Sequence, residues 1–446
     1  MSEKSCKTVG FISLGCDKNR VDSEKMLSEL DGKFNISNDI SECEVLVINS
    51  CAFLESSRKE AIDTVFEYVN LKTEGKLEKI ILTGCLPQKF IGELFDDLVE
   101  VDAFLGTFDQ SLISFAISEC YRTGKRLNLV GKGKELKTNR LLTTPMHYAY
   151  LKISDGCNNH CTYCLIPKIR GEYKSYPMEE LIDEAENLGD VKELIPVAQD
   201  TTRYGEDLYG EPRLVELIRK LTSLPNVGSV RLLYCYPEMI TDELIGEFKT
   251  NDKLLKYIDI PLQHADDKIL KLMNRKGTFD GYLRLIEKLK SEIPGIAVRS
   301  TFITGFPTES ESEHERLKDF LKKAELFNAG FFTYSREEGT AAYKLKGQVE
   351  ENVKLERQKE LYELQESIAE SNLKKFVGKD LKVLCDGIDY EKQSFYGRAY
   401  FSAPDVDGLV YFTSDETINQ GKYYVVHVNK TEQLDLYGEV KNEFTE

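Results

Sequence analysis

The sequence has no long apolar run. Among its 446 residues, no uninterrupted apolar stretch approaches the roughly 20 residues that a membrane-spanning helix needs. The first residues, MSEKSCKTVG, also lack the charged segment followed by an apolar one that is typical of a secretory signal. These two absences predict a soluble cytoplasmic protein without a membrane partner.

An excess of positive charge is also lacking. The chain has 59 Lys and Arg against 76 Asp and Glu, which gives a formal net charge of −17. A surface of this charge repels phosphate backbones unless a local basic patch overrides it, and it attracts a basic protein. The balance therefore disfavours a nucleic-acid partner.

The eleven cysteines do not have the pattern of a disulfide framework. Their number is odd, and they are scattered over a long chain rather than packed into a small secreted one. In a reducing compartment such thiols are metal ligands, catalytic groups or buried apolar side chains.

The chain is long enough for several domains. The order of its apolar runs divides it into parts. In residues 1–130, three β-branched runs at 8–16, 44–51 and 79–85 each end in a cysteine and alternate with helix-compatible stretches. This pattern predicts a parallel sheet covered by helices on both faces. Residues 131–146 are charged and poor in large apolar side chains, so they are predicted to be a linker.

The rest of the chain holds two further predicted domains. Residues 147–376 contain six strand candidates that alternate with helices, which predicts an open (β/α)6 barrel with function at the carboxyl ends of its strands. Residues 349–376 contain no glycine or proline and are predicted to form a connecting helix. Residues 377–446 switch to short alternating runs, which predict a small antiparallel β-barrel that serves as a binding module.

Cys157, Cys161 and Cys164 form a CxxxCxxC loop after a strand candidate. Three thiolates so placed can cap three corners of a cubane iron–sulfur cluster and leave the fourth iron open for a cosubstrate. A structural zinc ion needs a fourth ligand. His160 is the nearby candidate, but it is directly adjacent to Cys161, which makes a shared tetrahedral site awkward. The loop favours an iron–sulfur centre that binds S-adenosylmethionine and generates a carbon radical from it, with zinc or structural thiols as the alternative.

Five residues near strand ends are candidate contacts of S-adenosylmethionine. Tyr163 precedes the last cysteine of the loop, where it can cover the adenine or anchor the loop. Gln199 and Asp200 end a strand candidate and can hold polar groups of the cosubstrate, with helix capping as the alternative. Gly305 and Pro307 form a turn that lets the backbone approach a ligand.

Cys16, Cys51 and Cys85, the cysteine trio, lie 35 and 34 residues apart, which is the length of one strand–helix repeat. Each ends a strand of the same predicted sheet, so the thiols can converge in the crevice at its carboxyl edge. Three buried apolar cysteines are the plainer alternative. The periodic placement favours a second three-thiolate cluster, which could donate sulfur.

With these residues in view, the chain resembles the radical S-adenosylmethionine (radical SAM) methylthiotransferase family along nearly its whole length. The matching stretches are SLGCDKNRVDSE, VINSCAF, ILTGCLPQ, LKISDGCNNHCTYCLIPKIRG and TFITGFPTE. The resemblance implies an amino-terminal methylthiotransferase domain, a radical SAM domain and a carboxyl-terminal TRAM barrel. It also implies two [4Fe-4S] clusters, one on the CxxxCxxC loop and an auxiliary one on the cysteine trio. S-Adenosylmethionine would serve both as methyl donor and as radical source.

The resembled family has two main branches, one modifying an adenosine of transfer RNA and one modifying an aspartate of small-subunit ribosomal protein twelve. The stretches VAQDTTRYG, YIDIPLQHADDKILKLMNRKG and FTYSREEGTAA are more similar to the second branch. Residues 378–446 carry seven Lys and Arg against thirteen Asp and Glu, so the predicted barrel repels transfer RNA and attracts a basic protein. Its aromatic side chains can stack on bases, but such residues more often pack a small barrel; they are Phe395, Tyr396, Tyr400 and Phe401.

The expected activity is therefore addition of a methylthio group to the β-carbon of an aspartyl residue of ribosomal protein twelve, free or within the ribosomal subunit. An electron donor such as flavodoxin or ferredoxin is implied as a further partner. Two alternatives stay open. One is the formation of 2-methylthio-N6-isopentenyladenosine in transfer RNA, and the other is a non-catalytic iron–sulfur protein that docks on ribosomes.

Overall fold

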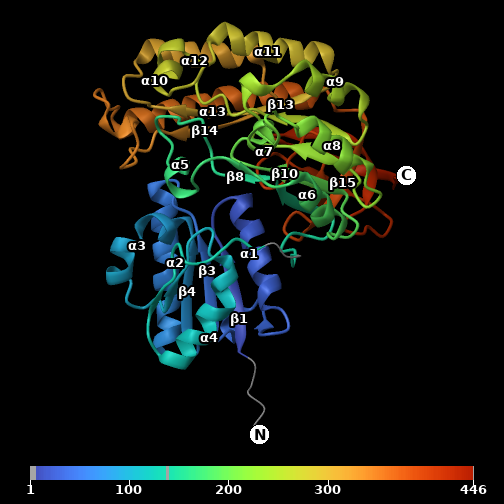
Figure 1. The fold of residues 1–446 in the computed structure, drawn as a ribbon. Coiled ribbons are helices and arrows are strands. Elements are labelled where there is room, and N and C mark those ends of the chain that lie inside the picture. The colour runs from blue at the N-terminus through green and yellow to red at the C-terminus, as the bar shows by residue number, and fades with distance from the viewer. Residues whose placement is uncertain (1–6, 137–139, 445–446) are drawn as a thin grey trace. The chain divides into compact units, whose positions relative to one another are not determined.

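The computed structural model describes residues 7–136 and 140–444 (Figure 1). The predicted linker thus includes three positions, 137–139, that lie outside the described residues. None of the described helices is long and apolar enough to cross a membrane. Contacts divide the chain into an amino-terminal unit, made of the residues up to Thr143 with Asp155–His160 and Cys164–Lys174, and a carboxyl-terminal unit, made of Thr144–Ser154, Cys161–Tyr163 and the residues from Ser175 onward.

A six-stranded parallel sheet forms the centre of the amino-terminal unit. Its strands are β1 (Thr8–Ser13), β2 (Asn35–Ile36), β3 (Val45–Ser50), β4 (Lys79–Gly84), β5 (Ala103–Phe104) and β6 (Leu127–Asn128). They lie in the order β2-β1-β3-β4-β5-β6, and every neighbouring pair is parallel. The three runs predicted from the sequence are β1, β3 and β4, whereas the two-residue strands were not predicted.

Two layers of helices cover this sheet. They are α1 (Asp17–Leu30), α2 (Glu55–Thr73), α3 (Cys85–Asp97), α4 (Ile113–Thr123) and the short α5 (Ile166–Ile169). Val45 and Val47 of β3 share a buried cluster with α1 and α4, whereas Leu46 and Ile48 share one with α2, α3 and α5. Successive side chains of a strand point to opposite faces, so β3 buries both of its faces. Figure 1 shows α1 and α3 on opposite sides of the strands. The predicted sheet with helices on both faces is confirmed.

A second six-stranded parallel sheet forms the centre of the carboxyl-terminal unit. Its strands are β7 (Tyr148–Lys152), β10 (Glu193–Val197), β11 (Val230–Leu232), β12 (Leu254–Asp259), β13 (Ala297–Thr304) and β14 (Asn328–Thr333). The order β14-β13-β12-β11-β10-β7 follows the chain, and the two outer strands are not paired with each other. This is the open (β/α)6 arrangement that the sequence predicts.

Helices follow these strands in alternation. They are α6 (Met178–Glu186), α7 (Glu206–Tyr209), α8 (Leu214–Ser223), α9 (Asp242–Thr250), α10 (Asp267–Leu272), α11 (Phe279–Glu292), α12 (Glu311–Ala324) and α13 (Glu351–Lys374). The last is the predicted connecting helix. Two short strands, β8 (Ser154–Asp155) and β9 (Lys174–Ser175), form a separate small sheet.

A closed five-stranded barrel ends the carboxyl-terminal unit. Its strands are β15 (Asp380–Asp389), β16 (Ser394–Arg398), β17 (Val410–Thr413), β18 (Tyr423–Glu432) and β19 (Asp435–Glu443), in the order β15-β16-β17-β19-β18. Four neighbouring pairs are antiparallel, as predicted, and the pair β17 with β19 is parallel. A ring with an odd number of strands cannot alternate in direction all the way round, so at least one parallel pair is unavoidable.

A chain of buried charges fixes this barrel to the β/α sheet within the carboxyl-terminal unit. Glu193 in β10 accepts hydrogen bonds from Arg231 of β11 and, at 2.7 Å, from Arg398 of β16. Arg398 also donates to Asp386, which lies 2.7 Å from Nε2 of His147. Burial opposes ionisation of Glu193, but the two guanidinium groups outweigh it and hold the pKa of this carboxyl below its ordinary value. Removing either arginine would leave a buried charge underpaired.

Candidate functional site

The cysteine trio lies at the carboxyl edge of the amino-terminal sheet. Cys16 follows β1 and caps α1, Cys51 follows β3, and Cys85 is the first residue of α3 after β4. These three strands are neighbours and run parallel. The chain runs from β1 outward to β2 and returns on the other side to β3, so the crevice between β1 and β3 is a topological switch point, where parallel sheets bind ligands.

The three loops of the trio meet at one side chain, Asn19 of α1. The Sγ atoms of Cys16 and Cys85 each lie 3.8 Å from Oδ1 of Asn19. Nδ2 of Asn19 donates to the carbonyl of Ser50, the residue before Cys51, at 3.0 Å. Asn19 is fully buried. The structure therefore brings together the three cysteines that are spaced by one strand–helix repeat in the sequence.

Two glycines allow these loops to approach each other. Gly84 has a φ of 96°, and a Cβ atom there would lie 2.3 Å from Oδ1 of Asn49 and 2.6 Å from the carbonyl oxygen of Ser50. Gly15 has a φ of 100°, and its Cβ would lie 2.8 Å from the Cβ of Cys51. Both positions need a residue without a side chain. The turn role that the sequence suggests for these glycines is thus explained by close packing of the cysteine loops.

Burial is the main influence on two thiols of the trio. Burial raises the pKa of Cys85 to about 12, although the positive charge of Arg170 opposes this shift. Burial also raises the pKa of Cys51 above its ordinary value. Both thiols are therefore protonated near neutral pH when no metal is bound, and a metal must displace their protons.

The trio fits an iron–sulfur cluster better than a single metal ion. Within 7–136 and 140–444, no three His, Cys, Asp or Glu side chains have the close spacing of a one-ion site. In a cubane cluster each thiolate binds a different iron, so the ligands lie further apart than those of one ion. The donor set consists of thiols, the ligands that such clusters use. The role of Cys16, Cys51 and Cys85 as ligands stays a prediction.

The CxxxCxxC loop carries hydrogen-bond donors near each sulfur. The backbone N–H groups two residues after Cys157 and two residues after Cys164 lie 3.5 and 3.4 Å from the respective Sγ atoms. The hydroxyl of Tyr236 lies 3.9 Å from Sγ of Cys161. All three cysteines are partly exposed. Polar hydrogens near sulfur are a common surrounding of cysteine ligands in iron–sulfur sites, so the loop suits the predicted cluster.

The contacts of this loop divide between the two units. Asp155–His160 and Cys164–Lys174 belong to the amino-terminal unit, where Leu165 and Ile169 share the buried cluster of α2 and α3. Cys161–Tyr163 belong to the carboxyl-terminal unit. The predicted domain boundaries, which assign the whole loop to one domain, stay predictions.

Tyr163 packs as an anchor of the loop. Its ring lies partly buried against an apolar cluster of the carboxyl-terminal unit, which consists of Ile269, Met273, Phe306, Tyr334 and Ala342. These contacts match the anchoring alternative given for it. A contact with the adenine stays a prediction.

Gln199 and Asp200 follow β10 and differ in their surroundings. Oε1 of Gln199 is buried and has no hydrogen-bond partner among the described residues. Asp200 is fully buried, accepts a hydrogen bond from Thr202 at 2.6 Å and lies 3.2 Å from Nε of Arg203. An unpaired buried acceptor is costly unless a ligand satisfies it, so Gln199 is the better of the two candidate contacts.

Gly305 and Pro307 lie in a buried turn after β13. A Cβ atom at Gly305 would lie 2.3 Å from Cγ of Lys354 in α13. The carboxylate of Glu309 accepts from the backbone N–H of Phe306 at 3.1 Å and so holds the turn. Packing against Lys354 therefore accounts for the glycine, and contact of this turn with a ligand stays a prediction.

Sequence reasoning missed four polar side chains beside these sites: Asn19, Arg170, Tyr236 and Arg275. The guanidinium of Arg275 lies 4.2 Å from the ring centre of Tyr236, beside Cys161. Asn19 lies one helical turn after Cys16, and residues at that spacing share one face of a helix. That spacing was an available signal for Asn19. Arg170 and Arg275 lie within stretches that resemble the family, whereas nothing local marks Tyr236.

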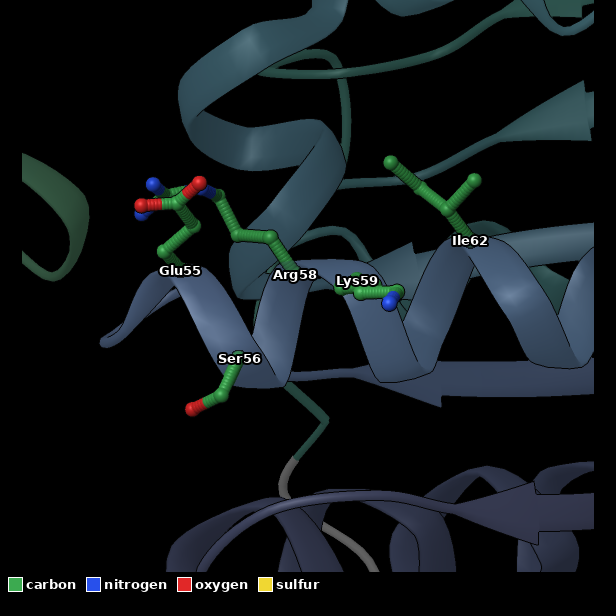
Figure 2. A pocket seen from close by; sticks show the side chains of 5 residues that line it. All are labelled: Glu55, Ser56, Arg58, Lys59 and Ile62. Carbon is green, nitrogen blue, oxygen red and sulfur yellow. The ribbon is translucent and has the colours of Figure 1, made fainter.

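A hollow of about 600 Å³ lies at the start of α2, shortly after Cys51. Its lining residues are Glu55, Ser56, Arg58, Lys59 and Ile62. Figure 2 shows the ends of the Glu55 and Arg58 side chains together, whereas Ser56 points away from them. A ligand site needs polar groups that converge on one point, so this hollow is not a candidate.

Three family models match the chain. The radical SAM superfamily matches residues 151–321, uncharacterized protein family UPF0004 matches residues 8–106, and the TRAM domain matches residues 377–440. The radical SAM match contains the whole CxxxCxxC loop, and the UPF0004 match contains the whole cysteine trio.

Relatives named ribosomal protein uS12 methylthiotransferase RimO match almost the entire chain. The protein of Lachnoclostridium phytofermentans is 46% identical over 434 residues, which cover 96% of this chain and 98% of that protein. The protein of Caldanaerobacter subterraneus subsp. tengcongensis is 47% identical over 440 residues, which cover 97% and 100%.

The fold is also similar to that of the radical S-adenosylmethionine methyltransferase TsrM from Kitasatospora setae, solved with a tryptophan substrate and an S-adenosylmethionine analogue. The TM-score is 0.52 at 12% identity, over 73% of this chain and 72% of that one. At this identity the likeness concerns the fold alone. Because these relatives are 46% and 47% identical over nearly the full length, the chain belongs to the ribosomal protein uS12 methylthiotransferase family of radical SAM enzymes.

Proposed function

We propose that this chain adds a methylthio group to the β-carbon of an aspartyl residue of ribosomal protein uS12. The observation that carries the proposal is the cysteine trio, because a radical enzyme that forms a carbon–sulfur bond needs a source of sulfur besides its radical centre. The trio supplies a second thiol set at a sheet edge, with Cys16 and Cys85 both 3.8 Å from the Asn19 oxygen.

The chain's own residues position and hold these centres. When bound, a cluster on the CxxxCxxC loop supplies an open iron and an electron to S-adenosylmethionine, and a cluster on the trio supplies a place for sulfur. The hydroxyl of Tyr236 lies 3.9 Å from Sγ of Cys161 and would donate to it once the sulfur is a thiolate ligand, and Tyr163 anchors the same segment. The buried oxygen of Gln199 has no partner among the described residues, so it would be free to accept a hydrogen bond from the cosubstrate.

The carboxyl-terminal barrel supports a protein substrate over transfer RNA. Residues 378–446 carry seven basic and thirteen acidic side chains, and such a surface attracts a basic ribosomal protein and repels phosphate. Phe401, a candidate base-stacking residue, is 3% exposed, and its ring centre lies 4.9 Å from that of Phe327 and 4.8 Å from that of Phe376. It packs the interior and offers no face to a base.

The partners of this reaction are proposed from its chemistry. Reductive cleavage consumes one electron, and a small flavodoxin or ferredoxin is the class of protein that delivers single electrons. The reduced thiols and a ribosomal substrate support action in the cytoplasm, on uS12 either free or within the ribosomal subunit. Turnover measured with free uS12 and with assembled subunits, each with reduced flavodoxin and with reduced ferredoxin, identifies both partners.

The substrate is tested by the intact mass of uS12 from a strain that lacks this chain. The protein should be lighter by one CH2S unit, and the wild-type chain should restore the mass whereas Cys161→Ala should not. An unchanged mass would reject the proposal. Nucleoside analysis of transfer RNA from the same strain separates the adenosine alternative, which predicts the loss of 2-methylthio-N6-isopentenyladenosine.

A further inference from the structure

Arg170 joins the surroundings of both cysteine sites inside the amino-terminal unit. It follows α5, and its side chain is 1% exposed. One terminal nitrogen donates to Oδ1 of Asn19 at 2.6 Å, and the other donates to the carboxylate of Asp155 at 2.7 Å. Asp22 lies 3.4 Å away. A buried arginine with these partners is a fixed fork rather than a mobile charge.

The fork determines the orientation of the Asn19 carboxamide. Arginine has only donors, so the atom of Asn19 that faces it must be the oxygen. The nitrogen then donates to the carbonyl of Leu14 at 3.2 Å and to that of Ser50 at 3.0 Å. Leu14 lies two residues before Cys16, and Ser50 lies directly before Cys51. The three contacts agree on one orientation, which links the loops of two cysteines.

The same oxygen faces the sulfur atoms of Cys16 and Cys85, each at 3.8 Å. The hydrogen bond from Arg170 holds this oxygen at its place beside the two sulfur atoms. The guanidinium therefore sets where the Asn19 oxygen lies relative to Cys16 and Cys85.

Arg170 also reaches the flank of the CxxxCxxC loop. Asp155 lies two residues before Cys157, and the backbone N–H of Cys157 donates to the carbonyl of Gly171 at 3.2 Å. The segment that leads into the loop is therefore paired with the segment that Arg170 begins. One guanidinium holds the centre of the trio and the approach to the loop at the same time.

The geometry of Arg170 matters besides its charge. Its two terminal nitrogens lie 2.7 Å from Asp155 and 3.4 Å from Asp22, so neighbouring side chains direct both of them. What lysine cannot reproduce is the planar pair of donors that reaches Asn19 and Asp155 together. Arg170→Lys therefore removes the fork and keeps the charge.

We propose that Arg170, acting through Asn19, is a positioning residue of the auxiliary cluster. It fixes the carboxamide around which the trio is arranged and couples that arrangement to the flank of Cys157. This inference rests on the proposed function, because it requires a cluster on the trio.

The test isolates the auxiliary site. In a Cys157→Ala/Cys161→Ala/Cys164→Ala parent, anaerobic reconstitution should give about four irons per chain, all on the trio. Adding Arg170→Lys should lower the iron content by at least about half and shift the midpoint potential measured by electron paramagnetic resonance. Arg140→Lys is the matched control, because the side chain of Arg140 is buried in the same unit and pairs with Glu24 at 2.9 Å.

Equal iron content and equal potential in the Arg170→Lys and Arg140→Lys proteins would overturn the inference. If the parent bound no cluster, the auxiliary site and the inference would both be overturned. S-Adenosylmethionine cleavage by the unsubstituted protein would then test the radical centre separately.

A second variant covers the case in which Arg170→Lys does not fold. Asn19→Asp keeps the size of the side chain and its contact with Arg170. It removes the donations to the carbonyls of Leu14 and Ser50, and it adds a negative charge beside Cys16 and Cys85. The midpoint potential should move to a more negative value, because the reduced cluster carries more negative charge. An unchanged potential would overturn the inference.

Discussion

Both cysteine sites consist of three thiols, but local sequence brings the thiols of the loop together, whereas the packing of strands brings those of the trio together. The CxxxCxxC loop lies within residues 157–164, so local chain geometry sets its spacing. The trio spans residues 16–85 and depends on strand register, for example the pairing of Ser50 in β3 with Gly84 in β4. A slip of one residue would turn every side chain of a strand to the other face. Damage to the fold should therefore reach the trio before it reaches the loop.

The largest effect is expected in the loop. Replacing Cys157, Cys161 or Cys164 by alanine should reduce 5′-deoxyadenosine formation from S-adenosylmethionine to background, because each removes a ligand of the predicted radical centre. Cys235→Ala is the control, since this cysteine is fully buried and belongs to neither site. Substantial S-adenosylmethionine cleavage by a loop variant would contradict the assignment of the radical centre to the loop.

A more selective effect is expected in the trio. Replacing Cys16, Cys51 or Cys85 by alanine should spare S-adenosylmethionine cleavage, stop methylthio insertion and lower the iron content from about eight to about four per chain. Cys120→Ala, a buried cysteine outside the trio, should change neither activity. If both activities fell equally, the two sites would not have separate roles.

The dependence of the trio on close packing gives a smaller effect. Gly84→Ala should lower the stability by about 2–4 kcal/mol, because the new Cβ would lie 2.3 Å from Asn49 and the backbone has a φ of 96°. Gly92→Ala in α3, where a Cβ meets no atom within 4 Å, should change it by less than about 1 kcal/mol. Thermal unfolding measures both, and equal midpoints would contradict the packing argument.

The smallest effect concerns thiol reactivity without metal. Burial raises the pKa of Cys85 to about 12, so the folded protein holds less of the reactive thiolate than the unfolded chain at any pH below that value. At about pH 8, Cys85 should react with iodoacetamide at least about tenfold more slowly in the folded than in the denatured protein, and the rate should rise with pH. Mass spectrometry of the labelled peptide measures this. Labelling as fast as that of the partly exposed Cys161 would contradict it.

The sequence was informative where apolar periodicity determines structure. It predicted β1, β3 and β4, the six-stranded open sheet and α13, because each has a clear run or a clear helical period. It missed the two-residue strands β2, β5 and β6 of the amino-terminal sheet, which are too short for a period. It also missed the parallel pair of β17 with β19, which follows from closing an odd ring.

The candidate site shows the same limit. The cysteines were found from spacing, but the hydrogen bond from Arg170 to Asn19 joins residues 151 positions apart. No local pattern encodes such a contact, because it exists only after the strands and α5 have packed. Side chains that arrange ligands are thus harder to predict than the ligands themselves.

The buried carboxylate of Glu193 has a practical consequence for studies of the barrel. One of its two guanidinium partners, Arg398, comes from β16. Truncating the protein ahead of β15 would strip the catalytic sheet of this counterion and uncover Phe327, so any resulting inactivity would reflect a damaged core instead of a missing docking module. Chimaeras that import a foreign barrel but retain Arg398 are the cleaner way to learn which partner the barrel selects.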